Sequence, residues 1–174
     1  NIAFGDSNLN WSQSDWNSTT HIGILATSLG SGHKFEENYI HNVLHGVVTY
    51  SDATMIRKNE INNFNGKAIR IFGDHSTVNL NTITYNYFTH SSNTGIQTSA
   101  NSTATQTLNK LLLWGNLIIE TTDPFKNFGG RLQGITGFDG TFKNLMVAHN
   151  TVVVNHSHGI SFSGLDTARI QNNS

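Results

Sequence analysis

Two sets of residues recur together along the chain, and this double repeat constrains the fold more than any other feature of the sequence. The first set is a glycine or alanine followed by an aliphatic residue, at intervals of 23, 22, 27, 39 and 25 residues. These starts are Gly23-Ile24, Gly46-Val47, Ala68-Ile69, Gly95-Ile96, Gly134-Ile135 and Gly159-Ile160. The second set is an asparagine between the starts, with an apolar residue three positions before it and, in the first five copies, another two positions after it. These asparagines are Asn38, Asn59, Asn86, Asn116, Asn150 and Asn173.

The residues after each start alternate between apolar and polar, as in Ile160-Ser161-Phe162-Ser163, which is the period of a strand with one buried face. A unit of this length cannot bury its apolar face alone, whereas stacked units can, with equivalent strands paired in parallel at roughly 4.8 Å. The repeat therefore predicts an all-β right-handed parallel β-helix, a single-stranded solenoid of about six to seven coils. We expect one domain over residues 1–174, as a segment of a longer protein. A leucine-rich solenoid would need a recurring Leu-x-x-Leu-x-Leu pattern, which the sequence lacks.

The predicted register places two aliphatic columns inside the coils. The first comprises Ile24, Val47, Ile69, Ile96, Ile135 and Ile160, and the second comprises Ile40, Ile61, Phe88, Ile118 and Val152. The asparagines suit sharp turns, where an amide can also bond the asparagine of the next coil. The glycines suit a tight turn or a close approach of neighbouring groups. Both anchors are therefore interpreted as structural.

The same register directs polar side chains outward in two columns. The first outer column is His45, Lys67, Thr94, Gln133 and His158, and the second is Leu25, Val48, Arg70, Gln97, Thr136 and Ser161. Three acids, Asp52, Asp74 and Asp139, lie just past the strand. Insertions at 98–110 and 119–132 belong to the longest unit and either form the walls of a cleft or merely protrude. Within the second insertion, Phe125 and Phe128 offer a stacking surface and Arg131 a cation.

Composition excludes several classes of protein. The formal net charge is −1 and only 12% of residues are charged, which argues against binding to nucleic acid. No apolar run approaches the ~20 residues of a membrane-spanning helix, and the absence of cysteine excludes disulfides and thiolate metal sites. His156 and His158, two apart on an expected strand, would share a face, but their spacing does not indicate a metal site. We expect no cofactor, although Ca²⁺ would suit isolated carboxylates such as Asp52, Asp74 or Asp139.

The coil pattern resembles the pectate-lyase-like superfamily of right-handed β-helix proteins across essentially the whole chain. The segment TDPFKNFGGRLQGITGFDG and the later NHSHGI resemble a narrower group of uncharacterised bacterial and phage β-helix proteins. Arg70, Gln97, Gln133, Asp139 and His158 match the motifs expected of that group, whereas Lys67 and Thr94 stand where it would have acids. The superfamily acts on, or grips, polysaccharides along an outer sheet groove.

The resemblance therefore implies a protein active on an acidic polysaccharide, of lyase or epimerase type, with hydrolysis as a variant. Elimination at a uronate needs a base, a neutralising group for the carboxylate and a proton donor to the leaving oxygen. Lys67 or His158 could be the base, Arg70 the carboxylate clamp, and His45 or His158 the acid. Hydrolysis would instead need two carboxylates, for which Asp74 and Asp139 are the candidates. The predicted site comprises Lys67, Arg70, His158 and Asp139 as catalytic residues, and His45, Gln97, Gln133, Arg131 and Asp74 as substrate-binding residues.

Two alternatives need no catalysis. One is a glycan-binding module of a phage tailspike or adhesin, and the other is a structural β-helical shaft or extracellular filament. All three hypotheses imply an extracellular, cell-surface or virion-associated protein. The resemblance to phage spikes is also compatible with a homotrimer.

Overall fold

The computed structural model describes residues 2–3, 14, 18, 21–27, 30–85, 92–99, 107–120 and 131–174. Its strands form three six-stranded parallel sheets, named here sheets 1, 2 and 3, and one two-stranded sheet. Sheet 1 contains β2 (Ile22–Ala26), β5 (His45–Thr49), β8 (Lys67–Ile71), β11 (Ser92–Ser99), β15 (Arg131–Phe138) and β19 (Ile160–Phe162). Sheet 2 contains β3 (Lys34–Glu36), β6 (Met55–Arg57), β9 (Thr77–Asn79), β13 (Leu112–Trp114), β17 (Leu145–Ala148) and β20 (Ala168–Gln171). Sheet 3 contains β1 (Ile2–Ala3), β4 (Tyr39–Val43), β7 (Glu60–Phe64), β10 (Thr82–Tyr85), β14 (Leu117–Glu120) and β18 (Thr151–Val153). The small sheet pairs β12 (Thr107–Asn109) with β16 (Thr141–Lys143).

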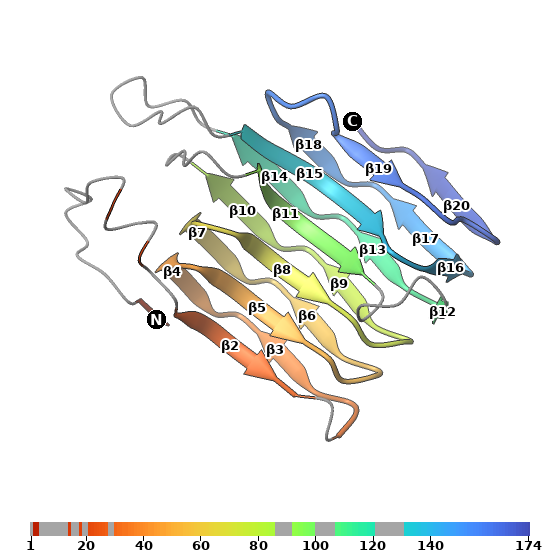
Figure 1. Cartoon of the computed structure of the whole chain (residues 1–174), viewed down its shortest axis with the longest axis horizontal. Coiled ribbons are helices and arrows are strands. Elements are labelled where there is room, and N and C mark those ends of the chain that lie inside the picture. Colours follow the sequence, from red (N-terminus) through yellow and green to blue (C-terminus); the bar gives the residue numbers. More distant parts are fainter. Residues whose placement is uncertain are drawn as a thin grey trace.

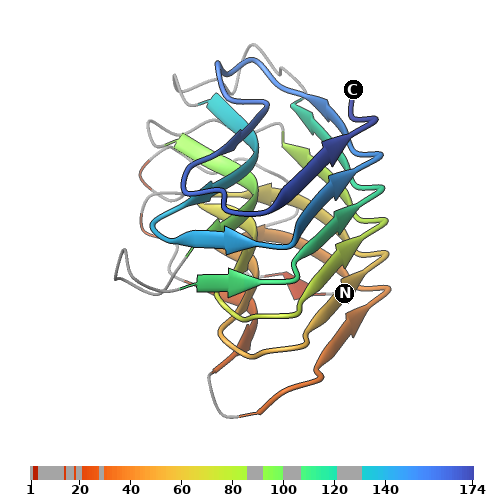
Figure 2. The ribbon, with the colours of Figure 1, turned by 90° about the vertical axis from the view of Figure 1, so that its right-hand side faces the viewer.

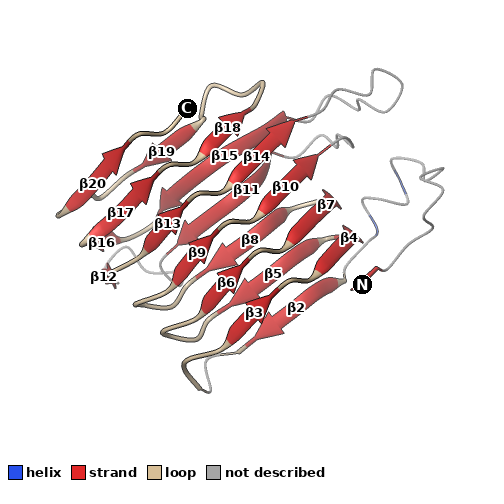
Figure 3. Ribbon diagram, turned by 180° about the vertical axis from the view of Figure 1, so that it is seen from behind, coloured by secondary structure: helices blue, strands red, loops and turns tan. Residues whose placement is uncertain are grey.

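The chain visits sheets 1, 2 and 3 in turn and then returns to sheet 1 one level further along the stack (Figure 1). Seen from the side, the colours pass from orange to blue level by level (Figure 2). The view from behind shows the same parallel strands joined by loops (Figure 3). This succession fits a parallel β-helix and confirms the predicted all-β, repeating architecture.

The interior consists of aliphatic columns, one from each sheet. Val47, Ile69, Ile96 and Ile135 of sheet 1 are fully buried, as are Ile40, Ile61, Ile83 and Ile118 of sheet 3 and Ile56, Val78, Leu113 and Val147 of sheet 2. Ile24, Val152 and Ile160 are partly buried and pack against this core from the outer levels. The two predicted inward columns are therefore confirmed, except that Phe88 lies outside the described residues and Ile83 occupies that level of sheet 3.

A continuous ladder of asparagine side chains joins the levels at the turn between sheets 2 and 3. At each step the backbone N–H and the Nδ2 of one asparagine donate to Oδ1 of the next, at 2.9–3.2 Å. The rungs are Asn38, Asn59, Asn81, Asn116, Asn150 and Asn173. The ladder was predicted, but one rung was assigned wrongly.

Asn81, not Asn86, is the third rung, and Asn86 lies outside the described residues. Both asparagines satisfy the apolar spacing, because Ile83 stands two residues after the first and three before the second. Parallel pairing decides between them, since Ile83 aligns with Ile61 and Ile118 of sheet 3. Val78, three residues before Asn81, aligns with Ile56 and Leu113 in sheet 2.

The left-handed backbone at this turn belongs to the residue before each asparagine. Positive φ angles of 51–67° occur at Glu37, Lys58, Leu80, Gly115, His149 and Asn172. The asparagines therefore contribute through their amides, and the expected left-handed conformation is adopted one residue earlier.

Candidate functional site

The residues of the first outer column align along sheet 1 in the predicted register, but Thr94 is fully buried, as is Thr136 of the second outer column. Lys67 of β8 aligns with Thr94 of β11, and Thr94 aligns with Gln133 of β15. The hydroxyl of Thr94 donates to Oε1 of Gln133 at 3.1 Å. His158 lies at the next level, where its carbonyl oxygen accepts a hydrogen bond from Gly134 N–H. Residues separated by up to 91 positions in the sequence, Lys67 and His158, thus belong to one column.

The second outer column carries polar groups on four successive strands. Arg70 aligns with Gln97, Gln97 with Thr136, and Thr136 with Ser161. Arg70 Nε, Gln97 Oε1 and Thr136 Oγ1 are each shielded from solvent, and each lacks a hydrogen-bond partner among the described residues. An unpaired buried polar atom costs roughly 1–3 kcal/mol, so such groups call for a partner such as water or a bound ligand. The set includes a donor, an acceptor and a hydroxyl.

Two core residues separate the two outer columns along β8. Ala68 and Ile69 are fully buried, whereas Lys67 and Arg70 on either side of them are only partly buried. In other coils of sheet 1 a glycine stands at the position equivalent to Ala68. These glycines leave room for side chains of sheet 3. An added Cβ would lie 2.9 Å from the Ile61 side chain at Gly46 and 2.8 Å from the Ile118 side chain at Gly95. The close-approach interpretation of this glycine column is therefore confirmed.

The imidazole of His45 is fixed against the start of β8. Its Nδ1 accepts a hydrogen bond of 2.9 Å from the backbone N–H of Lys67. Gly66 makes room for the ring, because a Cβ there would overlap His45 Cε1. Burial lowers the pKa of His45 to about 4, with repulsion from Arg70 and Lys67 as further causes. His45 is therefore neutral near pH 7 and suits hydrogen bonding to a ligand better than the acid role.

The amine of Lys67 is held in a state close to deprotonation. Burial, with the charge of Arg70 as a further cause, lowers its pKa to about 8. A base with a pKa near the working pH combines a useful neutral fraction with proton affinity. Lys67, Arg70 and His45 thus form a compact nitrogen-rich cluster whose members affect one another's charge.

The predicted acids lie at the end of sheet 1 rather than among these nitrogens. Asp74 Oδ1 accepts a hydrogen bond from Asn109 N–H at 2.9 Å, and Asp52 Oδ1 accepts one from Asp74 N–H at 2.7 Å. These two carboxylates therefore serve the turn that leads to sheet 2. Asp139 is exposed, with a φ of 59°, three residues beyond Thr136 of the second outer column.

One carboxylate near the first outer column was not predicted. Glu120 Oε2 accepts hydrogen bonds from Leu132 N–H at 3.2 Å and from Asn155 N–H at 2.9 Å. It thereby ties the end of β14 to the segments that carry Gln133 and His158. Glu120 lies at the start of the second insertion, which is the one local signal that could have identified it.

His156 and His158 lie in a bend before β19 rather than on a strand. Their ring centroids are 5.0 Å apart, and His156 Nδ1 accepts a hydrogen bond from His158 N–H at 3.0 Å. Within the described part of the chain, no three His, Asp or Glu side chains are grouped so that they could hold a metal ion. The pair is therefore better described as a locally ordered turn.

The predicted cleft walls fall largely outside the described residues. This holds for 100–106 and 121–130, including Phe125 and Phe128. Residues at the margins of the two insertions instead extend β11, β14 and β15 or form β12. Arg131 is the first residue of β15.

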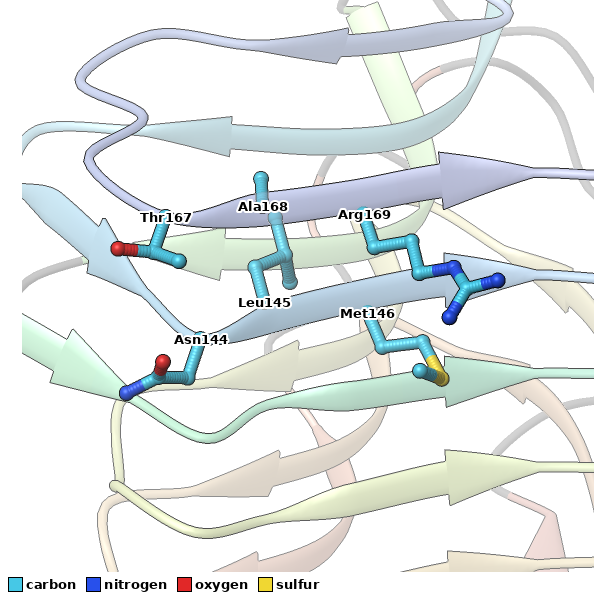
Figure 4. A pocket seen from close by; sticks show the side chains of 6 residues that line it. All are labelled: Asn144, Leu145, Met146, Thr167, Ala168 and Arg169. Carbon is cyan, nitrogen blue, oxygen red and sulfur yellow. The ribbon is translucent and has the colours of Figure 1, made fainter.

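A shallow depression of about 220 Å³ lies elsewhere, on sheet 2. It is lined by Asn144, Leu145, Met146, Thr167, Ala168 and Arg169, from β17 and β20 and the residues before them (Figure 4). None of the predicted site residues lines it. The hydrogen-bonded and electrostatic relationships described above make the outer face of sheet 1 the stronger candidate site.

Comparison with protein family models, with curated proteins and with solved structures gives no match. Among the described residues, no helix is long and apolar enough to cross a membrane. The fold and the site together define a repetitive parallel-sheet protein with a nitrogen-rich polar face on one sheet. Its function is therefore argued from that face.

Proposed function

We propose that this protein is a right-handed parallel β-helix of about six to seven coils, of pectate-lyase-like type, that acts on an acidic polysaccharide. The outer face of sheet 1 would bind the polymer, and its reaction would be elimination or epimerisation at a uronate. The observation that carries the proposal is the position of Lys67 and Arg70, close enough for the guanidinium to lower the pKa of the amine. A cluster of this kind favours a ligand that brings negative charge.

In this mechanism Arg70 pairs with the uronate carboxylate, which stabilises the negative charge that develops when the C5 proton leaves. The neutral amine of Lys67 takes that proton. The electrons of the C5–H bond form the C4=C5 double bond, and the C4–O bond to the neighbouring sugar breaks. Water supplies the proton to the leaving oxygen, because His158 lies three levels from Lys67 in the first outer column, roughly 14 Å away and out of reach of the same sugar. In an epimerase the intermediate would instead regain a proton at C5 from the opposite face.

The remaining polar residues would hold sugar hydroxyls. Gln97 and Gln133 lie on the neighbouring strands β11 and β15, and His45 lies one level below Lys67. Amide and imidazole groups can both donate to and accept from hydroxyls. Arg131 and Asp139 would contact the polysaccharide at the margins of the site.

Glycan binding without catalysis is the second candidate. It is favoured by the neutral state of His45, which weakens one proposed acid, and by the hydrogen bond that already occupies Asp74 Oδ1. The same hydrogen bond counts against hydrolysis through Asp74 and Asp139. The extracellular location, the homotrimer and Ca²⁺ binding remain predictions.

The deciding experiment measures unsaturated uronate by absorbance after incubation with alginate, polygalacturonate and glycosaminoglycans. We expect activity on at least one polymer, a rate that rises with pH until Lys67 is deprotonated near pH 8, and a loss of about 100-fold or more in kcat for Lys67→Met. Lys34→Met is the matched control, because Lys34 is exposed on β3 of sheet 2.

Saturable binding with no product on any polymer would replace the enzymatic proposal with the binding one. Chain cleavage without unsaturation would indicate hydrolysis, whereas inverted C5 configuration in an uncleaved polymer would indicate epimerisation. The absence of both binding and product would reject the proposal and leave the structural shaft.

A further inference from the structure

Two aromatic residues form a stack beside the second outer column. Tyr50 and Phe72 directly follow β5 and β8, with ring centroids 4.4 Å apart and planes inclined by 5°. Phe72 is 5% exposed, and its N–H donates to the carbonyl oxygen of Thr49. The Phe72 ring is therefore fixed by its backbone, by burial and by the neighbouring ring.

The guanidinium of Arg70 lies against this fixed ring. Its Cζ is 4.5 Å from the centroid of Phe72, within the range of a cation–π contact. Arg70 and Phe72 are two residues apart at the end of one strand, so their side chains project on the same side. Shielding of the ring from water strengthens the attraction between the cation and the π face.

The ring contact matters because hydrogen bonds leave Arg70 incompletely fixed. Within the described part of the chain, its buried Nε has no hydrogen-bond partner, and the same is true of Oε1 of Gln97 on the adjacent strand. A flexible four-bond side chain would otherwise lose conformational freedom when it meets an anion. A guanidinium that is already oriented avoids part of that entropy cost.

We propose that Phe72, supported by Tyr50, positions the Arg70 guanidinium for an anionic ligand. Neither aromatic residue is assigned a catalytic role: both act through Arg70. The inference rests on the proposed function for its ligand, a uronate, but the positioning itself is a property of the free protein. It can therefore be tested with and without glycan.

The first measurement follows the Nε–H signal of Arg70 in ¹⁵N NMR spectra of the free protein, with Arg70→Lys used to assign it. In Phe72→Leu we expect this signal to shift and its exchange with water to accelerate, because the ring over the guanidinium is lost. Phe72→Tyr should restore the wild-type signal. Tyr50→Leu, at a half-buried position, should change the Arg70 signal less and in the same direction. This variant replaces Phe72→Leu as the test if Phe72→Leu does not fold.

The second measurement is the Kd for a uronate oligosaccharide. Phe72→Leu should weaken binding about threefold to tenfold, whereas Phe72→Tyr should leave the Kd unchanged. In a protein that already carries Arg70→Gln, Phe72→Leu should not weaken binding any further. An unchanged Arg70 signal in folded Phe72→Leu and Tyr50→Leu would overturn the positioning role. If the wild-type protein binds no uronate while the Arg70 signal responds as expected, the proposed function fails and the positioning role stands.

Discussion

The backbone N–H of Lys67 donates a hydrogen bond to Nδ1 of His45, 2.9 Å away, across two adjacent levels of sheet 1. This contact fixes the neutral tautomer of His45 that carries its proton on Nε2. It also brings two titratable nitrogens into the same partly buried surroundings. Much of the pH behaviour of this face follows from the arrangement.

His45 should make the protein sensitive to acid. Its folded pKa of about 4 lies below the ordinary value of 6.5, mainly because burial disfavours the imidazolium. The unfolded chain therefore binds more protons between pH 6.5 and pH 4, and the free energy of unfolding falls as the pH drops through this window. We expect His45 to contribute a loss on the order of 1–2 kcal/mol, allowing for its partial exposure.

Urea unfolding at pH 7 and pH 4.5 measures this contribution. His45→Gln, which keeps an acceptor for Lys67 N–H, should lose less stability between the two pH values than the wild-type protein. Equal losses in the two proteins would show that other groups account for the acid sensitivity.

Lys67 should titrate near pH 8 rather than near 10.5, because burial and the charge of Arg70 both disfavour its ammonium form. Removing the charge in Arg70→Gln should raise the pKa of Lys67, while burial should still keep it below 10.5. ¹³C NMR of the lysine side chain follows this titration directly, with Lys67→Met used to assign the signal. A Lys67 signal that titrates near the ordinary value of 10.5 would contradict the role of Lys67 as a base near neutral pH.

Two glycines of the same column should respond very differently to alanine. At Gly134 an added Cβ would overlap the Val152 side chain and the Gly159 carbonyl, whereas at Gly159 nothing lies within 4 Å. Gly134→Ala should destabilise the protein by about 2 kcal/mol or more through overpacking, and Gly159→Ala should have little effect. Thermal and urea unfolding of these two variants tests whether sheet 1 packs on sheet 3 as described. Similar losses of stability in both variants would contradict this packing.

The buried rung Asn81 should be costly to remove. Its Oδ1 accepts from Asn59, and its Nδ2 donates to Asn116 Oδ1 and to the carbonyl oxygen of Ile56. Asn81→Ala leaves several of these groups unpaired inside the protein, so we expect a loss of about 2–4 kcal/mol. Asn62→Ala, whose amide makes only exposed bonds, is the control in urea unfolding. If Asn81→Ala lowers the free energy of unfolding no more than Asn62→Ala does, the asparagine ladder does not stabilise the protein appreciably.

The sequence was sufficient to predict the sheets and their register because glycine and aliphatic residues recur at nearly constant spacing. It was insufficient at Asn81 and Asn86, where the same apolar residue, Ile83, satisfies the pattern for either asparagine. Parallel pairing with Ile61 and Ile118 resolves that ambiguity, and pairing cannot be seen in one strand alone.

The site was only partly predictable for a similar reason. Register alone predicts that Lys67 and Arg70 lie on the strand next to that of Gln97, and the pairing of β8 with β11 agrees with this. The contact of Phe72 with Arg70, the hydrogen bonds of Glu120 and the occupied carboxylate of Asp74 depend on side-chain geometry. No spacing rule contains that information.

A cysteine cross-link tests most directly whether the site residues lie on neighbouring strands, because the chain contains no cysteine of its own. Arg70 and Gln97 are paired in register between β8 and β11, within the Cα separation that a disulfide can bridge. Mild oxidation should cross-link the Arg70→Cys, Gln97→Cys double variant within one molecule, and should leave the Lys67→Cys, Gln97→Cys variant, three residues out of register, largely reduced. Equal cross-linking of both variants, or cross-linking of the out-of-register pair alone, would contradict the alignment on which the proposed site depends.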